Sequence, residues 1–164
     1  MKILVTGGAG FIGSHIAEYL VQRGDDVTVL DNLHTGKKEN LVKINDKITF
    51  VNGDIRDYNL LEKLVSDVSD VYHEAALASV QQSFNMKDEY VDVNVNGTEN
   101  IFKLAREYGF KVVYASSSSV YGNPKKVPIK EDDDRKPINP YAETKLNDEY
   151  LAKKYSEMDV KVIG

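Results

Sequence analysis

The sequence KILVTGGAGFIG occupies residues 2–13 and combines an apolar run with a glycine-rich turn. The apolar, partly β-branched run Lys2–Thr6 is typical of a buried strand. After the glycines, Ile12, Ile16 and Leu20 recur at helical spacing. A strand that passes through such a turn into a helix is typical of a parallel α/β sheet with a phosphate-binding first turn.

The glycines of this turn follow the spacing Gly-x-x-Gly-x-x-Gly, a variant of the dinucleotide fingerprint. Gly7 and Gly10 let the backbone turn tightly and approach a pyrophosphate, and Gly13 lets the helix pack closely on the sheet. Free N–H groups at the helix N-terminus would then point at the phosphate. The turn predicts a dinucleotide site, with an ordinary glycine-rich turn as the alternative.

Asp31 ends the second expected strand, Val27–Asp31, and lies 21 residues after Gly10. A carboxylate at this place accepts hydrogen bonds from the adenosine ribose hydroxyls and repels a 2′-phosphate. It therefore favours NAD over NADP. Lys37 and Lys38 follow closely enough in the chain to keep NADP open.

Short β-branched runs alternate with helical patterns along the whole chain. Beyond the first strand, we expect strands at Val27–Asp31, Ile48–Asn52, Asp70–Glu74, Lys111–Ser116 and Val160–Ile163. We expect helices over about 12–21, 60–68, 87–108 and 141–156, and a proline-containing loop over 118–139. This alternation predicts an α/β fold, a Rossmann-type doubly wound parallel sheet with helices on both faces.

The composition narrows the classes of function. A chain of 164 residues suits a single domain, residues 1–164. Its 21 Lys and Arg against 26 Asp and Glu give a formal charge of −5, which argues against nucleic acid or a membrane surface as a partner. The absence of cysteine excludes disulfides and thiol nucleophiles, and no metal site is expected. Without a signal-peptide or transmembrane pattern, we expect a cytoplasmic protein.

Tyr141 and Lys145 are four residues apart at the start of an expected helix, so they share one face. A free tyrosine, with a pKa near 10, is a poor base at neutral pH. A neighbouring ammonium and a bound nicotinamide cation both favour the phenolate. Such a phenolate can take a hydroxyl proton while a hydride leaves the same carbon. Because this spacing is common on helix surfaces, a surface pair is the alternative.

Four serines, residues 116–119, stand at the end of the expected strand Lys111–Ser116. The carboxyl end of a parallel strand opens onto the ligand crevice, so a hydroxyl there can hold a substrate oxygen. The chain has no Gly-x-Ser-x-Gly elbow, which argues against a hydrolase nucleophile. A polar serine loop is the alternative interpretation.

Taken in order, seven motifs resemble the extended short-chain dehydrogenase/reductase family, in its nucleotide-sugar epimerase branch. They are GGAGFIG (7–13), DNLHTG (31–36), GDIRD (53–57), HEAA (73–76), NVNGT (94–98), SSSSVYG (116–122) and PYAETK (140–145). The resemblance covers the whole chain. It implies NAD as the cofactor and a nucleotide sugar, a UDP-hexose, as the substrate.

The resemblance also implies a role for each matching residue. Tyr141 would be the base, Lys145 would bind the nicotinamide ribose, and Ser117 would be the catalytic hydroxyl. The implied cofactor-binding residues are Gly7, Gly10, Phe11, Ile12, Gly13, Asp31, Asn32, Asp54, Ile55, Ala75, Ala76, Asn94, Tyr141 and Lys145. The implied substrate-binding residues are Ser79, Val80, Ser83, Ser117 and Ser118.

The implied reaction is inversion at C4 of the hexose through a transient 4-keto sugar. The dehydratase branch carries Asp-Glu after its catalytic hydroxyl, whereas this chain has Ser118 and Ser119, so dehydration is disfavoured. A hexuronate 4-epimerase, another enzyme of the family such as a dehydratase, and a non-catalytic NAD-binding module stay open.

The last expected strand, Val160–Ile163, is followed only by Gly164. We therefore expect the chain to be the N-terminal, cofactor-binding part of a longer enzyme, without its substrate domain. Such a chain should bind NAD but turn over a UDP-sugar poorly. An unpaired sheet edge after this strand favours self-association, with a homodimer as the expected form.

Overall fold

The computed structural model describes residues 1–164 and has a six-stranded sheet at its centre, with the strand order β3-β2-β1-β4-β5-β6. Every pair of neighbouring strands is parallel. The strands are β1 (Lys2–Thr6), β2 (Asp26–Asp31), β3 (Ile48–Asn52), β4 (Asp70–His73), β5 (Lys111–Tyr114) and β6 (Val162–Ile163). From β1 the chain adds β2 and β3 on one side of the sheet, and it then adds β4, β5 and β6 on the other, so the switch point lies between β1 and β4. This confirms the doubly wound sheet and places its ligand crevice outside the carboxyl ends of those strands.

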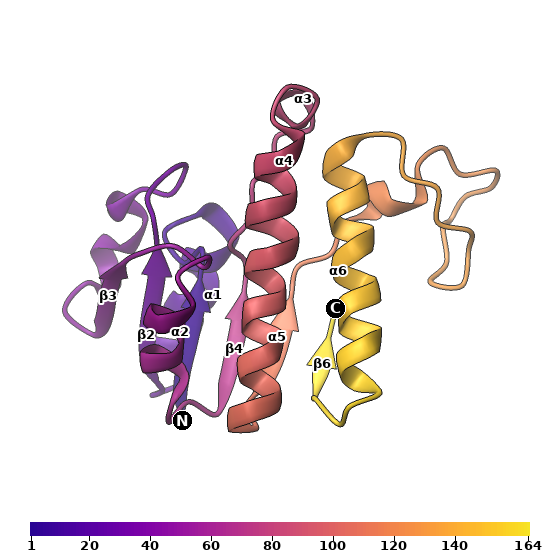
Figure 1. Cartoon of the computed structure of the whole chain (residues 1–164). Helices are drawn as coiled ribbons and strands as arrows, with labels where there is room; N and C mark the ends of the chain where they lie inside the picture. The colour runs from indigo at the N-terminus through magenta and orange to yellow at the C-terminus, as the bar shows by residue number, and fades with distance from the viewer.

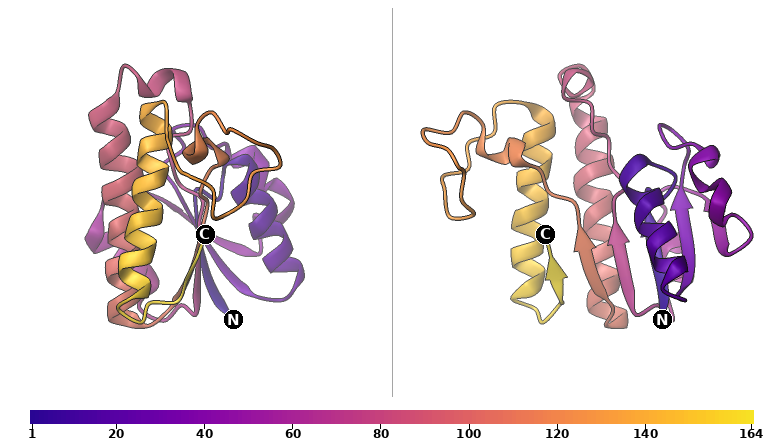
Figure 2. Two further views of the ribbon diagram at one scale, coloured as in Figure 1. Left: turned by 90° about the vertical axis from the view of Figure 1, so that its right-hand side faces the viewer. Right: turned by 180° about the vertical axis from the view of Figure 1, so that it is seen from behind.

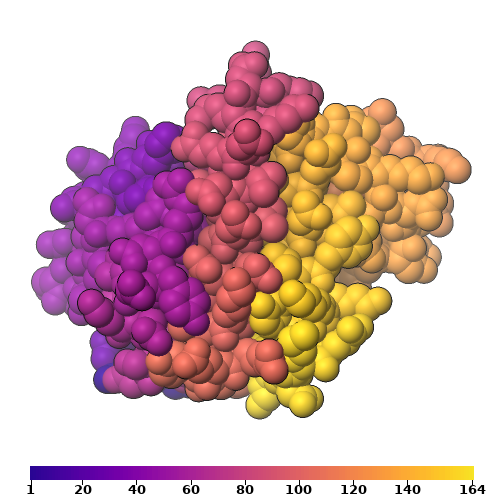
Figure 3. Space-filling model, in the orientation of Figure 1, coloured from indigo at the N-terminus to yellow at the C-terminus, as the bar shows by residue number.

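Helices cover both faces of the sheet, as the alternating pattern predicted (Figures 1 and 2). Helix α1 (Phe11–Gln22) and the 3-10 helix η1 (Lys38–Ile44) pack on one face. Helices α2 (Tyr58–Val65), α5 (Gly97–Tyr108) and α6 (Pro140–Ser156) pack on the other. Figure 3 shows α5 and α6 side by side on that face.

The core divides into two clusters because successive strand residues point to opposite faces. Ile3 and Val5 belong to the cluster under α1 and η1, whereas Leu4 between them belongs to the cluster under the other helices. All three residues are at most 1% exposed. The continuous apolar run of β1 therefore reflects a central strand that is covered on both sides.

The helical stretch predicted over 87–108 is continuous but not uniform. It consists of α4 (Lys87–Tyr90), the π-helical turn η2 (Val91–Asn96) and α5. The sequence pattern missed three short helices, η1, α3 (Val80–Ser83) and η3 (Ser118–Tyr121), and η3 lies inside the stretch expected to be loop. Helices of one or two turns are too short to show a period.

Three strands are shorter than the pattern predicted. β4 ends at His73 rather than Glu74, β5 ends at Tyr114 rather than Ser116, and β6 begins at Val162 rather than Val160. The residues beyond β4 and β5 leave the sheet at its carboxyl edge, where they form the site described below. No helix combines the length and the apolar character needed to cross a bilayer.

Candidate active site

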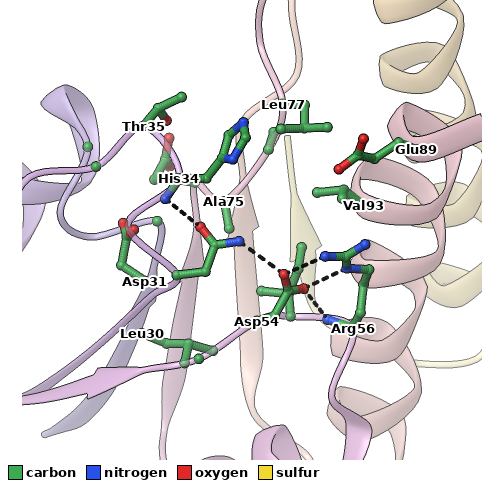
Figure 4. A pocket seen from close by; sticks show the side chains of 18 residues that line it. Leu30, Asp31, His34, Thr35, Asp54, Arg56, Ala75, Leu77, Glu89 and Val93 are labelled. Carbon is green, nitrogen blue, oxygen red and sulfur yellow. Dashed lines mark hydrogen bonds and ion pairs between the residues drawn. The ribbon is translucent and has the colours of Figure 1, made fainter. Parts of the chain in front are cut away.

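A cavity opens at the carboxyl ends of β1 to β4, and Figure 4 shows the side chains that line it. The structure brings eight of the predicted cofactor-binding residues into its lining: Gly7, Gly10, Asp31, Asn32, Asp54, Ile55, Ala75 and Ala76. They come from four separate strand ends, so the fold assembles the predicted group. The remaining predicted residues lie outside the lining and are placed individually below.

The glycine turn lies directly against the end of β4. Gly7 has a φ of +64°, and a Cβ added there would lie 2.6 Å from the Ala75 nitrogen. The Gly10 N–H donates to the Gly7 carbonyl at 3.0 Å and brings the chain into α1. A Cβ on Gly13 would lie 2.8 Å from Gly8 Cα. Only glycine fits these close approaches, so the backbone itself forms this wall of the site.

Helix α1 starts with two apolar side chains that water largely surrounds. Phe11 is 79% exposed and Ile12 is 59% exposed. The Phe11 ring lies 4.8 Å from the His15 ring, centroid to centroid. Gly10 caps the helix without any side-chain hydrogen bond, which leaves the N–H groups of the first turn available to an anion.

The Asp31 carboxylate is fixed at the end of β2 and is only 7% exposed. Its Oδ2 accepts from the Ala9 N–H at 2.9 Å, and its Oδ1 accepts from the Leu33 N–H at 2.8 Å. A Cβ on Gly36 would lie 2.7 Å from Oδ1. Each carboxylate oxygen accepts one N–H and keeps capacity for a second donor. Asp31 thus joins the glycine turn to the cavity and can still accept hydroxyl groups.

A second carboxylate, Asp54, is held by Arg56 across the cavity rim (Figure 4). Arg56 donates from Nε at 2.9 Å and from Nη2 at 2.8 Å, and Asn32 Nδ2 donates at 3.0 Å. The Arg56 hydrogen bonds hold the pKa of Asp54 well below its usual range. Arg56 also reaches Asp92 at 3.2 Å, which links the end of β3 to η2. Sequence reasoning missed Arg56, although the GDIRD motif contains it.

His73 ends β4 as a buried, neutral hydrogen-bonding group. Its Nδ1 lies 2.7 Å from Thr6 Oγ1 and its Nε2 lies 2.8 Å from Thr98 Oγ1. Burial, and secondarily the charge of Lys145, lowers the His73 pKa to about 3. The ring therefore joins β1, β4 and α5 without carrying charge. The next residue, Glu74, lines the cavity, and burial raises its pKa against the opposing effect of Lys145.

Helix α6 presents the predicted tyrosine and lysine in its first turns. Asn139 caps it by accepting from the Ala142 N–H at 2.8 Å, and Pro140 occupies the first position. Tyr141 is partly exposed, whereas the Lys145 side chain is only 6% exposed. The Lys145 charge acts on both His73 and Glu74, so the ammonium lies at the carboxyl end of β4.

The serine run leads into the short helix η3, which has Ser117 as its N-cap and packs against α6. Ser117 Oγ accepts from the Ser119 N–H at 3.2 Å and from the Ser119 hydroxyl at 2.8 Å. Ser118 is exposed. Ser116 donates to Glu149 Oε1 at 2.7 Å, which fixes the start of the run to α6. Ser117 therefore caps a short helix that packs against α6, the helix whose first turn carries Tyr141.

The predicted residues of the 77–94 region are placed differently from one another. Ser79 caps α3, accepting from the Gln82 N–H at 3.3 Å, and Val80 is 40% exposed. Ser83 is fully buried, and its hydroxyl donates to the Val80 carbonyl at 2.6 Å. Helix α3 packs against α6, the helix that carries Tyr141.

Asn94 is fully buried and braces the loop after β4. Its Oδ1 accepts from the Leu77 N–H at 2.8 Å, and its Nδ2 donates to the Leu77 carbonyl and to Thr144 Oγ1, both at 3.0 Å. The π-helical turn η2 carries this side chain. Asn94 therefore fixes the cavity wall to α6 from behind. No group of three His, Cys, Asp or Glu side chains comes together to hold a metal ion.

The chain was compared with known proteins. Residues 4–162 match the family model described as GDP-mannose 4,6 dehydratase. A UDP-glucose 4-epimerase of Lactobacillus helveticus is 43% identical over 149 residues, which cover 89% of this chain and 44% of that protein. This chain spans about half the length of the curated relatives that it matches.

Two solved structures illustrate the similarity of fold. The UDP-N-acetylglucosamine 4-epimerase of Methanobrevibacter ruminantium M1, in complex with UDP-N-acetylmuramic acid, superposes with a TM-score of 0.94 and 37% identity, over 98% of this chain and 52% of that one. DesIV, a dTDP-glucose 4,6-dehydratase of Streptomyces venezuelae with NAD bound, has a TM-score of 0.94 and 34% identity, over 99% and 54%.

Proposed function

We propose that the chain is the NAD-binding part of a nucleotide-sugar 4-epimerase. It belongs to the extended short-chain dehydrogenase/reductase family, in its nucleotide-sugar epimerase and dehydratase branch. One observation supports this most strongly. The glycine turn, the fixed Asp31 carboxylate and the Lys145 ammonium all lie at the carboxyl edge of the parallel sheet.

The residues around the cavity fit NAD. The open N-terminus of α1 and the Gly7 cradle suit the pyrophosphate, because its oxygens need donors and close backbone approach. The Asp31 carboxylate suits the adenosine ribose and disfavours a 2′-phosphate. Asp54 and Ile55 are assigned to the adenine, and Lys145 to the nicotinamide ribose. When bound, NAD would supply the hydride acceptor.

The reacting groups would be those of α6 and η3. Tyr141 would take the proton of the 4-hydroxyl group, and Ser117 would hold the same oxygen by a hydrogen bond. Lys145 would orient the cofactor ribose and favour the phenolate through its charge. Once the keto sugar has turned and the hydride has returned to the opposite face of C4, Tyr141 would give the proton back to the oxygen, which leaves the hexose inverted at C4.

Two features support epimerisation over dehydration. The residues after Ser117 are the uncharged Ser118 and Ser119, which supply no carboxyl group for elimination of water. The relative from Lactobacillus helveticus is a UDP-glucose 4-epimerase. The similarity to DesIV favours a second candidate, a 4,6-dehydratase, which the product of the reaction would distinguish.

The proposal is tested by Tyr141→Phe in the full-length enzyme of which this chain would be the cofactor-binding part, loaded with NAD and with UDP-galactose as substrate. We expect kcat to fall by on the order of 10²–10⁴, because the proton acceptor is lost. NADH binding, followed by fluorescence, should persist. Tyr150→Phe is the control, since Tyr150 lies on the same helix and is 57% exposed. An unchanged rate in Tyr141→Phe would remove Tyr141 from the mechanism, and a 4-keto-6-deoxy product would support the dehydratase.

A further inference from the structure

Lys145 makes a buried ion pair that the proposed chemistry does not by itself require. Its Nζ lies 3.1 Å from Asp148 Oδ2, and the two side chains are 6% and 1% exposed. The residues are three apart on α6, so they share one face of the helix. An ammonium removed from water needs a counter-charge nearby, and Asp148 supplies it.

The other titratable groups near Lys145 make no hydrogen bond with its ammonium. His73, on β4, has both ring nitrogens paired with threonine hydroxyls. Glu74 lines the cavity, and Glu149 is bound by Ser116 and Arg135 at 2.7 Å each. Tyr114, on β5, faces Asp148 and Glu149, and burial raises its pKa to about 12. Asp148 is the carboxylate that accepts a hydrogen bond from Lys145.

Asp148 itself is incompletely satisfied. Its Oδ1 is buried and has no hydrogen-bond partner, and its Oδ2 accepts from the Lys145 ammonium. Burial raises its pKa to about 6, although Lys145 and the nearby Thr98 hydroxyl oppose this effect. The carboxylate therefore takes up a proton only slightly below neutral pH, and the ionic part of the pair is lost there.

We propose that Asp148 is the positioning residue of Lys145, holding the ammonium at the carboxyl end of β4 where the nicotinamide ribose would lie. This inference rests on the proposed function, because the ribose is assigned to Lys145 there. An ammonium has three N–H donors. Asp148 takes one of them, and two remain for ribose hydroxyls or the Tyr141 oxygen. A lysine held from behind loses less side-chain freedom when it binds the cofactor.

The test compares NADH affinity of the wild-type chain and of Asp148→Asn from pH 5 to 8, by fluorescence titration. Asparagine keeps the shape but removes the charge. We expect affinity at pH 7.5 to fall about tenfold, the scale of a hydrogen bond between charged groups. Wild-type affinity should also decline below about pH 6 as Asp148 is protonated, whereas the affinity of Asp148→Asn should vary much less there.

Glu143→Gln is the matched control, because it removes the same charge from an exposed position of the same helix. It should retain the wild-type affinity and the wild-type pH profile. If Asp148→Asn does not fold, the wild-type pH profile still tests the inference, which requires NADH affinity to decline below about pH 6.

Equal affinities and parallel pH profiles in the wild-type chain and Asp148→Asn would overturn the inference and leave the proposed function standing. A wild-type chain that binds no NADH at any pH would overturn both.

Discussion

His73 shows how a single buried side chain can couple the site to the stability of the fold. It bonds Thr6 and Thr98 and stays neutral in the folded chain. In the unfolded chain its pKa returns to about 6.5. Between that value and the folded pKa of about 3, the unfolded state binds more protons than the folded state. The stability that His73 contributes is complete above pH 6.5 and is lost as the pH falls toward 3.

We therefore expect acid to destabilise the wild-type chain more than His73→Asn. Urea unfolding of both should show the difference between their unfolding free energies falling by about 2 kcal/mol from pH 7 to pH 5. Asp148 has the opposite effect, because its raised pKa favours the folded state as the pH falls toward about 4. Both chains contain Asp148, so its effect cancels when their unfolding free energies are subtracted. A difference that stays constant with pH would contradict the buried, neutral state of His73.

The sequence predicted those cofactor-site residues whose role follows from their position along the chain. Asp31 could be predicted because a carboxylate at the end of the second strand is a local signal, and the structure places it in the cavity. The partnership of Lys145 with Asp148 was missed, because helical spacing shows that two residues share a face but not that the face is buried. The local sequence around Ser83 and Asn94 likewise does not indicate that both side chains are buried.

At the scale of elements, the turn between β1 and α1 was predictable and the short helices were not. The glycine spacing fixes a backbone path that no other residue type allows, so the local sequence determines the turn. By contrast, α3 and η3 owe their position to packing against α6, a contact distant in sequence. The π-helical turn η2 likewise carries Asn94, whose hydrogen bonds to Leu77 and Thr144 join segments distant in sequence.

The turn gives a prediction that separates backbone strain from steric overlap. Gly7→Ala and Gly109→Ala both place alanine at a positive φ, which costs roughly 1–2 kcal/mol. At Gly109 the added Cβ meets open space, whereas at Gly7 it meets the backbone of Glu74 and Ala75. In urea unfolding, Gly7→Ala should lose more stability than Gly109→Ala.

NADH titration of the same two variants extends this prediction to the site. Gly7→Ala should bind NADH at least tenfold more weakly, because the turn must move away from the end of β4. Gly109→Ala, at the far end of α5, should bind NADH as the wild type does. Equal stability losses and unchanged NADH affinity in both variants would show that the close approach at Gly7 is not required.

In the molecule as a whole, the strand order explains why residues that are distant in the chain meet at one edge of the sheet. Because β1 lies beside both β2 and β4, the glycine turn reaches Asp31 on one side and Ala75 on the other. The parallel crossovers also place α6 beside α5, and the Lys145 charge on α6 acts on Glu74, which follows β4. The alternation of strands and helices predicted this architecture, since each parallel connection requires a crossover.

A crystal structure of the protein with NAD bound would test the proposed cofactor site most directly. We expect the pyrophosphate at the N-terminus of α1, the adenosine ribose on Asp31, and the nicotinamide ribose within about 2.7–3.2 Å of Lys145 Nζ, with Tyr141 beside the nicotinamide ring. A dinucleotide bound away from the glycine turn, or a nicotinamide ribose out of reach of Lys145, would contradict it.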